Sequence, residues 1–299
     1  MPNADRFVAL IRDAAVALPE RPAPPLDEAF AARLFPDRRP SLGGIRAVLL
    51  DVYGTLFSSS AGEIGVGTEY RRGNLDGLAA EFADGLTGEE LKDYFRAAVQ
   101  EEHLRLFPTT PYPEVRVEEL WARLSGLKAG ADCRELALRF ELAVNPAYPE
   151  EGLADCLAAL RSAGIVLGIV SNAQFYTPLL FRAFLGGPPE ELGFSRDLLI
   201  YSFEAGEAKP SPALFAAASA ALAARGIAPS ETLYLGNDML NDVYAARGSG
   251  FATCLFAGDA RSLRLRSDNR LCRGLAPDAV IRRLADLRAL VGVEEAVRG

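Results

Sequence analysis

The sequence predicts an α/β protein: a Rossmann-like three-layer sandwich with a mostly parallel sheet and an inserted helical domain. Two observations lead to this prediction. Short apolar runs alternate with stretches of helical periodicity, which is typical of a parallel sheet covered by helices on both faces. One stretch, about residues 72–148, has helical periodicity and no convincing strand, which indicates a helical insertion between two strands.

The composition limits the class of protein. A chain of 299 residues forms one or two domains, and 49% hydrophobic with 24% charged residues is typical of a globular protein. The net charge of −8 argues against a nucleic-acid-binding surface. No run is long and apolar enough for a membrane span, and residues 1–18 carry charges at helical spacing, unlike a signal peptide. We therefore expect a cytoplasmic protein without membrane partners.

Residues 1–43 are predicted to form an N-terminal helical arm. Two short helices, at about residues 4–18 and 26–35, are separated by the proline-rich stretch 21–25. Such an arm serves either as a packed extension or as an oligomer contact, so a homo-oligomer is one expected assembly.

Residues 44–56 and 151–299 are predicted to form the α/β core. Within the core, Ser211 and Pro212 mark the start of a helix that Gly226 ends. A helix is also expected at 152–163, and a final helix at 277–291 is expected to cover the sheet. The predicted strands are residues 47–50, 165–170, 198–203, 233–235 and 251–256.

Residues 57–150 are predicted to contain the inserted helical domain. Its clearest helical stretches are 88–107, 113–127 and 133–144, with 146–151 as the return linker. The glycine-rich loop at 58–67 either folds over a site or is an exposed connection.

Polar residues follow several of the predicted strands. Asp51 ends the first, Ser171 the second, and Asp238 and Asp242 follow the fourth, while Lys209 lies in the loop after the third. Carboxyl ends of parallel strands meet at one edge of the sheet, where α/β proteins place their ligands. For Asp51 alone, the simpler alternative is a residue that opens a turn or caps a helix.

Two residue types are scarce. His103 is the only histidine, and its helical context, EEHLRL, indicates a structural or surface role. Among 32 basic residues only Lys92, Lys128 and Lys209 are lysines, which suggests that a compact ammonium is needed at some of these positions.

Four segments in order resemble the motifs of the haloacid dehalogenase-like hydrolase superfamily, of the type with a helical cap. The segments are DVYGTL at 51–56, SNA at 171–173, KP at 209–210 and GNDMLND at 236–242. The resemblance covers about residues 45–290, and the cap is inserted after the first motif.

The resemblance implies covalent catalysis on a small-molecule substrate. Asp51 would be the nucleophile, Ser171 would donate a hydrogen bond to the transferring group, and Lys209 would neutralise developing charge. Thr55 and Asn172 belong to the same motifs and are further candidate catalytic residues; for Asn172 and Asn237 the alternative role is to shape turns. Mg²⁺ would be held by Asp51, Asp238, Asp242 and the backbone carbonyl of Tyr53, although Asp242 could instead serve a helix N-terminus.

Tyr53 departs from the phosphatase pattern, in which a second aspartate acts as general acid and base. A phenol with a pKa of about 10 is a poor base at neutral pH, and tyrosine at this position is similar to metal-independent 2-haloacid dehalogenases. The surplus of carboxylates argues for a metal. The favoured interpretation is therefore Mg²⁺-dependent hydrolysis or transfer of a phosphoryl group. The alternatives are a 2-haloacid dehalogenase, with Arg96 or Arg71/Arg72 as its cap arginine, and a catalytically weak binding protein.

Overall fold

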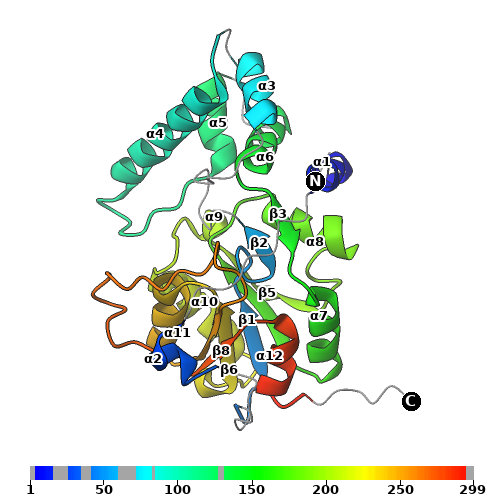
Figure 1. Ribbon diagram of the computed structural model, residues 1–299, viewed down its shortest axis with the longest axis vertical. Coiled ribbons are helices and arrows are strands. Elements are labelled where there is room, and N and C mark those ends of the chain that lie inside the picture. Colours follow the sequence, from blue (N-terminus) through cyan, green and yellow to red (C-terminus); the bar gives the residue numbers. More distant parts are fainter. Residues whose placement is uncertain are drawn as a thin grey trace.

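The computed structural model describes residues 4–15, 26–34, 42–59, 72–82, 85–126 and 131–293. Its centre is a six-stranded sheet in the order β5-β4-β1-β6-β7-β8, in which every pair of neighbours is parallel (Figure 1). The predicted α/β fold class is confirmed. The strands are β1 (Ala47–Leu50), β4 (Val166–Ser171), β5 (Phe194–Tyr201), β6 (Thr232–Gly236), β7 (Ala252–Phe256) and β8 (Ala279–Ile281).

The central strand β1 is buried on both faces, which explains its uninterrupted apolar sequence. Successive side chains of a strand point to opposite faces. Val48 and Leu50 therefore belong to one core, and Ala47 and Leu49 belong to the other. The first core also contains α7 (Leu153–Ser162) and α12 (Leu284–Leu290); the second contains α10 (Pro212–Ala223) and α11 (Ala245–Gly248). These are the three layers of the sandwich.

The predicted final helix at residues 277–291 is wrong in its first half. Residues Ala279–Ile281 form β8, which pairs with β7, and the helix α12 begins only at Leu284. A short apolar run cannot be assigned to helix or strand from periodicity alone. The arm covers the free edge of β8, because Val280 N–H donates to the carbonyl of Arg33 at 2.8 Å. Covering this edge prevents unwanted strand pairing there.

Other boundaries differ by a few residues. The third predicted strand begins earlier, at Phe194, and the residues expected to end it form the short helix α9 (Ser202–Ala205). In the arm, α1 covers Ala4–Ala14 and α2 only Glu28–Ala31, both shorter than expected. The sheet domain also contains a 3₁₀ turn (Pro229–Glu231), a π-helical turn η2 (Met239–Tyr244) and the helix α8 (Thr177–Leu185).

The helical insertion consists of α3 (Arg72–Phe82), α4 (Gly88–Leu106), α5 (Val117–Ser125) and α6 (Ala131–Val144). It lies at the carboxyl end of the sheet (Figure 1). Trp121 stacks on Phe95 at 5.0 Å and packs against Phe140 at 5.1 Å, so these helices have an aromatic core of their own. Contrary to expectation, two short strands flank it: β2 (Phe57–Ser59) pairs antiparallel with β3 (Ala147–Pro149). The rest of the loop predicted at 58–67 lies outside the described residues.

Helix α1 contacts both parts of the molecule. Its Arg12 Nε donates to the carbonyl of Ala183 in α8 at 2.8 Å, and its Phe7 ring packs near Phe175 at 6.4 Å. On its other side, Arg6 forms an ion pair of 2.6 Å with Glu135 of the insertion. The arm therefore bridges the sheet domain and the helical insertion. None of the helices in the described ranges is long and apolar enough to cross a bilayer.

Candidate active site

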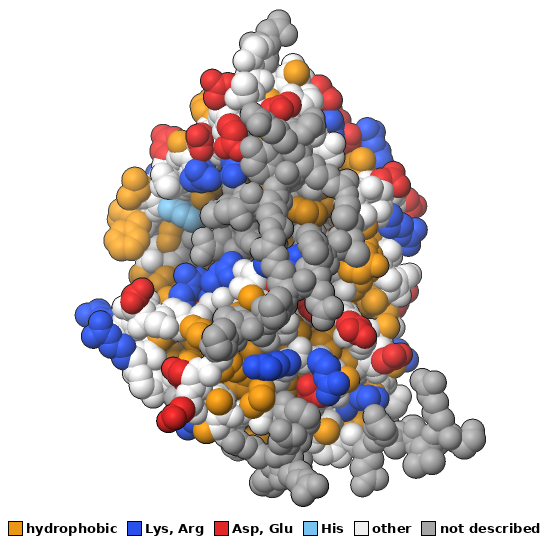
Figure 2. All heavy atoms as spheres, in the orientation of Figure 1, with side chains coloured by type: hydrophobic (Ala, Val, Ile, Leu, Met, Phe, Trp, Pro, Cys, Tyr) orange, Lys and Arg blue, Asp and Glu red, His pale blue; other side chains and the backbone are white. Residues whose placement is uncertain are grey.

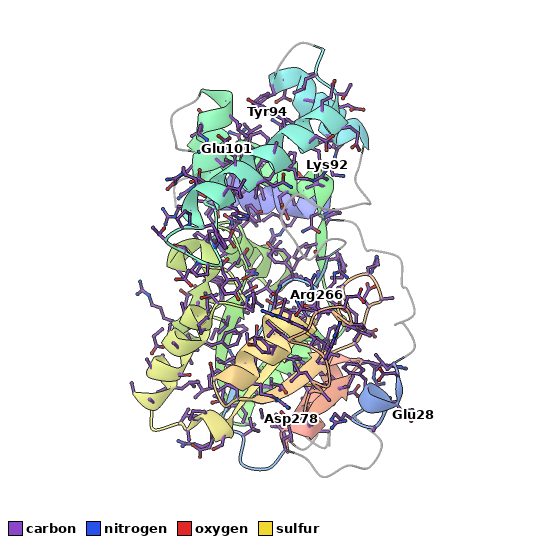
Figure 3. All side chains as sticks on the ribbon, turned by 90° about the vertical axis from the view of Figure 1, so that its left-hand side faces the viewer. Glu28, Lys92, Tyr94, Glu101, Arg266 and Asp278 are labelled. Carbon is purple, nitrogen blue, oxygen red and sulfur yellow. The ribbon has the colours of Figure 1, made fainter. Side chains whose placement is uncertain are left out.

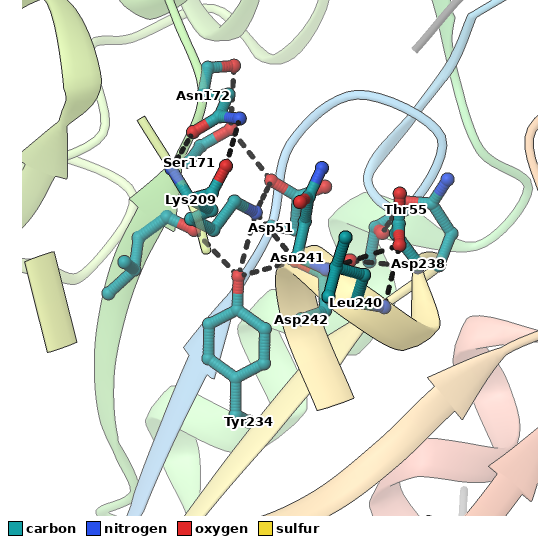
Figure 4. Close-up of polar contacts among 12 residues, drawn as sticks. Asp51, Thr55, Ser171, Asn172, Lys209, Tyr234, Asp238, Leu240, Asn241 and Asp242 are labelled. Carbon is teal, nitrogen blue, oxygen red and sulfur yellow. Dashed lines mark hydrogen bonds and ion pairs between the residues drawn. The ribbon is translucent and has the colours of Figure 1, made fainter. Parts of the chain in front are cut away.

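The ends of three adjacent strands form the site (Figure 4). Leu50, the last residue of β1, pairs in register with Ile169 of β4 and Leu235 of β6. Asp51 and Ser171 therefore reach the same edge of the sheet, and the segment after β6 brings Asp238 and Asp242 to it. The sequence predicts that these polar residues meet at this edge, because they follow parallel strands along the chain.

Asp51 is held by two donors. Its Oδ1 accepts hydrogen bonds from Ser171 Oγ at 2.8 Å and from Lys209 Nζ at 2.7 Å. The residue is 6% exposed, and its Oδ2 accepts no hydrogen bond from any described residue. One carboxylate oxygen is therefore fixed by hydrogen bonds, and the other is available to attack a substrate, as a nucleophile requires.

Lys209 lies between the carboxylates. Its Nζ also donates to Asp242 Oδ1 at 2.6 Å and to the hydroxyl of Tyr234 at 3.0 Å, so three acceptors match the three N–H bonds of an ammonium. Burial lowers the pKa of Lys209, but the charges of Asp242 and Asp51 raise it by more, and the net shift is upward. The lysine is therefore charged in the site.

Asn172 and Thr55 position other parts of the site. The side chain of Asn172 accepts from the backbone N–H of Lys209 at 2.6 Å, which fixes the loop that carries the lysine. Thr55 Oγ1 donates to Asn237 Oδ1 at 3.2 Å and ties the first motif to the last. Gly54, which directly precedes Thr55, has φ +80°. A Cβ at this position would lie 2.5 Å from Asn237 Nδ2, so only glycine fits the turn.

Tyr53 is not placed to act as a general acid or base. Its hydroxyl lies 3.0 Å from Thr177 Oγ1 at the start of α8. Burial raises the pKa of Tyr53 far above that of an ordinary phenol, and the nearby Glu141 raises it further. The phenol therefore stays neutral and hydrogen-bonded at any pH at which the protein would work.

Asp238 and Asp242 are both engaged by donors of the chain itself. Asp238 Oδ1 accepts from the N–H groups of Leu240 and Asn241 at 2.8 and 3.1 Å and so caps η2. Its Oδ2 accepts from the guanidinium of Arg266 at 2.7 and 3.0 Å. Asp242 Oδ2 accepts from the backbone N–H of Asp238 at 2.9 Å.

This donor set does not fit the predicted magnesium site in the arrangement that the structure has. Mg²⁺ requires oxygens at about 2.0–2.1 Å in near-octahedral geometry, whereas those of Asp238 and Asp242 face N–H donors. Across the described ranges, no three His, Cys, Asp or Glu side chains are grouped so that they could hold a metal ion. The ligand set of Asp51, Tyr53, Asp238 and Asp242 remains a prediction that requires rearrangement.

Comparison with known proteins identifies the family. A family model described as haloacid dehalogenase-like hydrolase matches residues 45–250, more than half of the chain. The chain is a haloacid dehalogenase-like hydrolase. The resemblance inferred from the four motifs is confirmed.

Solved structures of this hydrolase superfamily are similar to the chain. A HAD phosphatase from Thermococcus onnurineus has a TM-score of 0.53 at 21% identity, covering 84% of this chain and 100% of the other. L-2-haloacid dehalogenase from Xanthobacter autotrophicus has a TM-score of 0.48 at 21% identity, covering 82% and 98%. The search of curated proteins found no significant match.

The hydrolase has a cavity between the helical insertion and the sheet. A small cavity of about 30 Å³ beside Asp51 adjoins a larger one of about 610 Å³, a volume that suits a small molecule. Both are lined by Lys209 and Arg266, and Arg96 and His103 of α4 line the larger one. His103 thus faces a cavity, whereas its sequence context indicated only a structural or surface role. Arg71 and the side chain of Arg72 lie outside the described residues.

The larger cavity is lined by side chains of both charges: Arg96, Lys209 and Arg266, together with Glu114 and Glu141. Figure 2 shows basic side chains at the level where the insertion meets the sheet domain, and Figure 3 places Arg266 at the top of the sheet domain, facing the insertion. Two contributors to the site, Arg266 and Tyr234, were not predicted. Tyr234 belongs to the strand predicted at 233–235, and its hydroxyl contacts Lys209 and lies 2.7 Å from the carbonyl of Val170. A lone tyrosine in a fully buried strand was the available signal, because its hydroxyl needs a partner.

The insertion of this hydrolase is also tied to the sheet domain next to Lys209. The backbone N–H of Glu114 donates to the carbonyl of Gly206 at 3.1 Å, and that of Ala208 donates to the carbonyl of Tyr112 at 2.8 Å. The buried carboxylate of Glu114 accepts from Ser202 Oγ at 2.6 Å. We call this contact of residues 112–116 with 202–208 the latch.

Glu114 is expected to make stability depend on pH. Burial raises the pKa of Glu114 to about 7, well above that of an ordinary glutamate, against the opposing effect of the hydrogen bond from Ser202. Because the folded state binds the proton more tightly, this contribution is full below about pH 4.5 and is lost as the pH rises through 7. The loss is about 3 kcal/mol. In urea unfolding at pH 4.5 and 7.5, Glu114→Gln should gain stability relative to wild type by about this amount. An unchanged difference between the two proteins would contradict the pKa shift.

Proposed function

We propose that the chain hydrolyses a small anionic substrate through a covalent ester on Asp51, and that the leaving group departs as an anion without needing a proton. A small 2-halo acid meets both conditions. The proposal rests on three observations: the oriented carboxylate of Asp51, the adjoining cavity with Arg96 in its lining, and the state of Tyr53.

Tyr53 is the observation that carries the proposal. Hydrolysis of a phosphoric ester with an alkoxide leaving group needs a proton donor, which typically contributes about 10²- to 10⁴-fold to the rate. Tyr53 occupies the position two residues after the nucleophile, but its hydroxyl is paired with Thr177 and its pKa is raised by burial. Halide is a stable anion and leaves without such help.

The reaction would proceed in two steps. Asp51 Oδ2 attacks the halogen-bearing carbon, so that a C–O bond forms while the C–halogen electron pair leaves with the halide. Ser171 and Lys209 hold Oδ1 during the attack. Water then attacks the carbonyl carbon of the Asp51 ester and breaks its bond to the substrate oxygen, which regenerates the carboxylate. One hydrogen of the water ends on the hydroxyl of the released hydroxy acid, and the other leaves to solvent as a proton. Arg96, which lines the larger cavity, is the candidate to bind the substrate carboxylate.

Mg²⁺-dependent phosphoryl hydrolysis is the second candidate. One observation favours it: Asp51, Asp238 and Asp242 converge at one edge, which is more negative charge than halide displacement requires. Asp51, Asp238 and the carbonyl of Tyr53 would hold the ion, which would stabilise charge on the phosphoryl group. This candidate requires Arg266 to leave Asp238.

A substrate screen separates the two candidates. Halide and phosphate release should be measured over small 2-halo acids and small phosphoric esters, each with Mg²⁺ and with a chelator. We expect halide release that the chelator does not affect. Phosphate release that depends on Mg²⁺, without halide release, would establish the second candidate instead.

Replacing Tyr53 with Asp should change the two activities in opposite directions. A carboxylate two residues from Asp51 adds negative charge beside the nucleophile and repels an anionic substrate, so halide release should fall. In a phosphatase held back by the missing acid, phosphate release should instead rise, by up to about 10²-fold. Tyr53→Phe is the matched control, since it keeps the ring and removes only the contact with Thr177. Circular dichroism must show that both variants fold.

A further inference from the structure

Arg266 forms an ion pair that no motif predicted. Its Nη2 and Nε lie 2.7 and 3.0 Å from Asp238 Oδ2, and Nε lies 3.3 Å from Oδ1. The arginine comes from the segment between β7 and β8, whereas Asp238 follows β6. The Asp238 side chain is 8% exposed and that of Arg266 is 31% exposed, so the carboxylate is shielded from water while the guanidinium is partly exposed.

The backbone at Arg266 is unusual. Arg266 has φ +51°, and it is the one non-glycine residue with a positive φ among the described ranges. Non-glycine residues rarely adopt a positive φ, and residues held in this conformation are concentrated at functional sites. The left-handed backbone here directs a guanidinium onto a carboxylate of the last motif.

The ion pair and a divalent cation exclude each other at Asp238. One oxygen of this carboxylate caps η2, and the other faces the guanidinium. A metal ion bound to the second oxygen would lie on the same side as the N–H groups of Arg266 and would repel them.

Two cations of the chain offset most of the negative charge of the site without a metal. Lys209 contacts Asp51 and Asp242, and Arg266 contacts Asp238. Three carboxylates therefore face two cations of the chain. Lys209 alone leaves a surplus of two negative charges, and Arg266 lowers this surplus to one.

We propose that Arg266 is a built-in counter-ion that occupies Asp238 in place of a divalent cation, so that the wild-type site does not take up Mg²⁺ at millimolar concentration. The inference agrees with the metal-independent reaction proposed above but stands on the ion pair. When Arg266 is paired in 90–99% of molecules, the apparent affinity of the free carboxylate for Mg²⁺ is lowered about 10- to 100-fold.

Removing Arg266 should create a magnesium site. Arg266→Gly is the suitable variant, because glycine adopts φ +51° without strain and the fold should be retained. In calorimetry with MgCl₂ we expect no binding by wild type at millimolar concentration and binding at least about 10-fold tighter by the variant. Mg²⁺ should also raise the melting temperature of the variant but not of wild type.

Three further proteins make the test specific. Arg266→Gln removes the charge but keeps a long side chain, and it should also gain Mg²⁺ binding. Arg266→Gly combined with Asp238→Asn should lose the binding again. Arg264→Ala removes a positive charge from the lining of the same small cavity, and it should behave as wild type.

Two outcomes would overturn the inference. If wild type binds Mg²⁺ as tightly as Arg266→Gly, Arg266 does not compete with the ion. If a folded Arg266→Gly protein binds no Mg²⁺, the freed acids do not form a site and Arg266 replaces nothing. Both results are independent of catalysis, so wild type that releases no halide while the binding results hold would refute only the proposed function.

Discussion

Asp51→Asn is expected to lower kcat by about 10⁴-fold or more on whichever substrate the screen identifies, because an amide cannot form the ester intermediate. The variant should still fold, since the amide oxygen can accept from Ser171 and Lys209 as the carboxylate does. The measurement is the steady-state rate, together with a single turnover of wild type in ¹⁸O-labelled water. With a 2-halo acid as substrate, that turnover should place the heavy isotope in the Asp51 carboxylate, because water attacks the ester carbon.

Asp197→Asn is the matched control, because Asp197 is a surface aspartate paired only with Arg225 in the described part of the chain. It should keep the wild-type rate. An Asp51→Asn protein that turns over substrate at the wild-type rate would refute covalent catalysis at this position. A wild-type protein with no turnover on any substrate would leave the third hypothesis, a binding protein that retains the pocket.

Lys209→Met should reduce both activity and stability. The change leaves Asp51 and Asp242 buried without their shared cation, and breaking a buried ion pair in this way costs about 3–5 kcal/mol. The rate should fall by at least about 10²- to 10³-fold, because charge that develops on the reacting group is no longer stabilised. Urea unfolding measures the first effect and substrate turnover the second.

Lys209→Arg separates charge from geometry. The guanidinium keeps the charge, but its planar fork is larger than an ammonium and cannot meet three acceptors that surround a single nitrogen. We expect most of the rate to be lost in this variant. Full activity would mean that the lysine is incidental. Tyr234→Phe removes only one of the three acceptors and should have a much smaller effect.

The sequence predicted the parts of the site that follow strands. Asp51 and Ser171 each follow an apolar run, and parallel strands bring such positions together whatever the loops between them do. The order of the motifs then identified the family. Lys209 was found for a different reason: it is one of very few lysines in a chain that otherwise uses arginine.

The remaining parts depend on contacts that leave no local pattern. Arg266 reaches Asp238 across residues without periodicity, and nothing distinguishes it in sequence from the other arginines nearby. Glu114 reads as an ordinary surface acid before a helix, although Ser202 from a distant segment buries and binds it. The strand β8 was missed because three apolar residues carry too little information to indicate a period.

The attachments of the helical insertion bear on how substrate reaches Asp51. The insertion is joined to the sheet domain by the paired strands β2 and β3, by the latch beside Lys209 and, through the ion pair of Arg6 with Glu135, by α1. A domain anchored on several sides cannot swing open about one hinge without breaking buried hydrogen bonds. We therefore expect substrate to reach Asp51 by local movement of side chains at the cavity mouth, without rigid-body opening of the insertion.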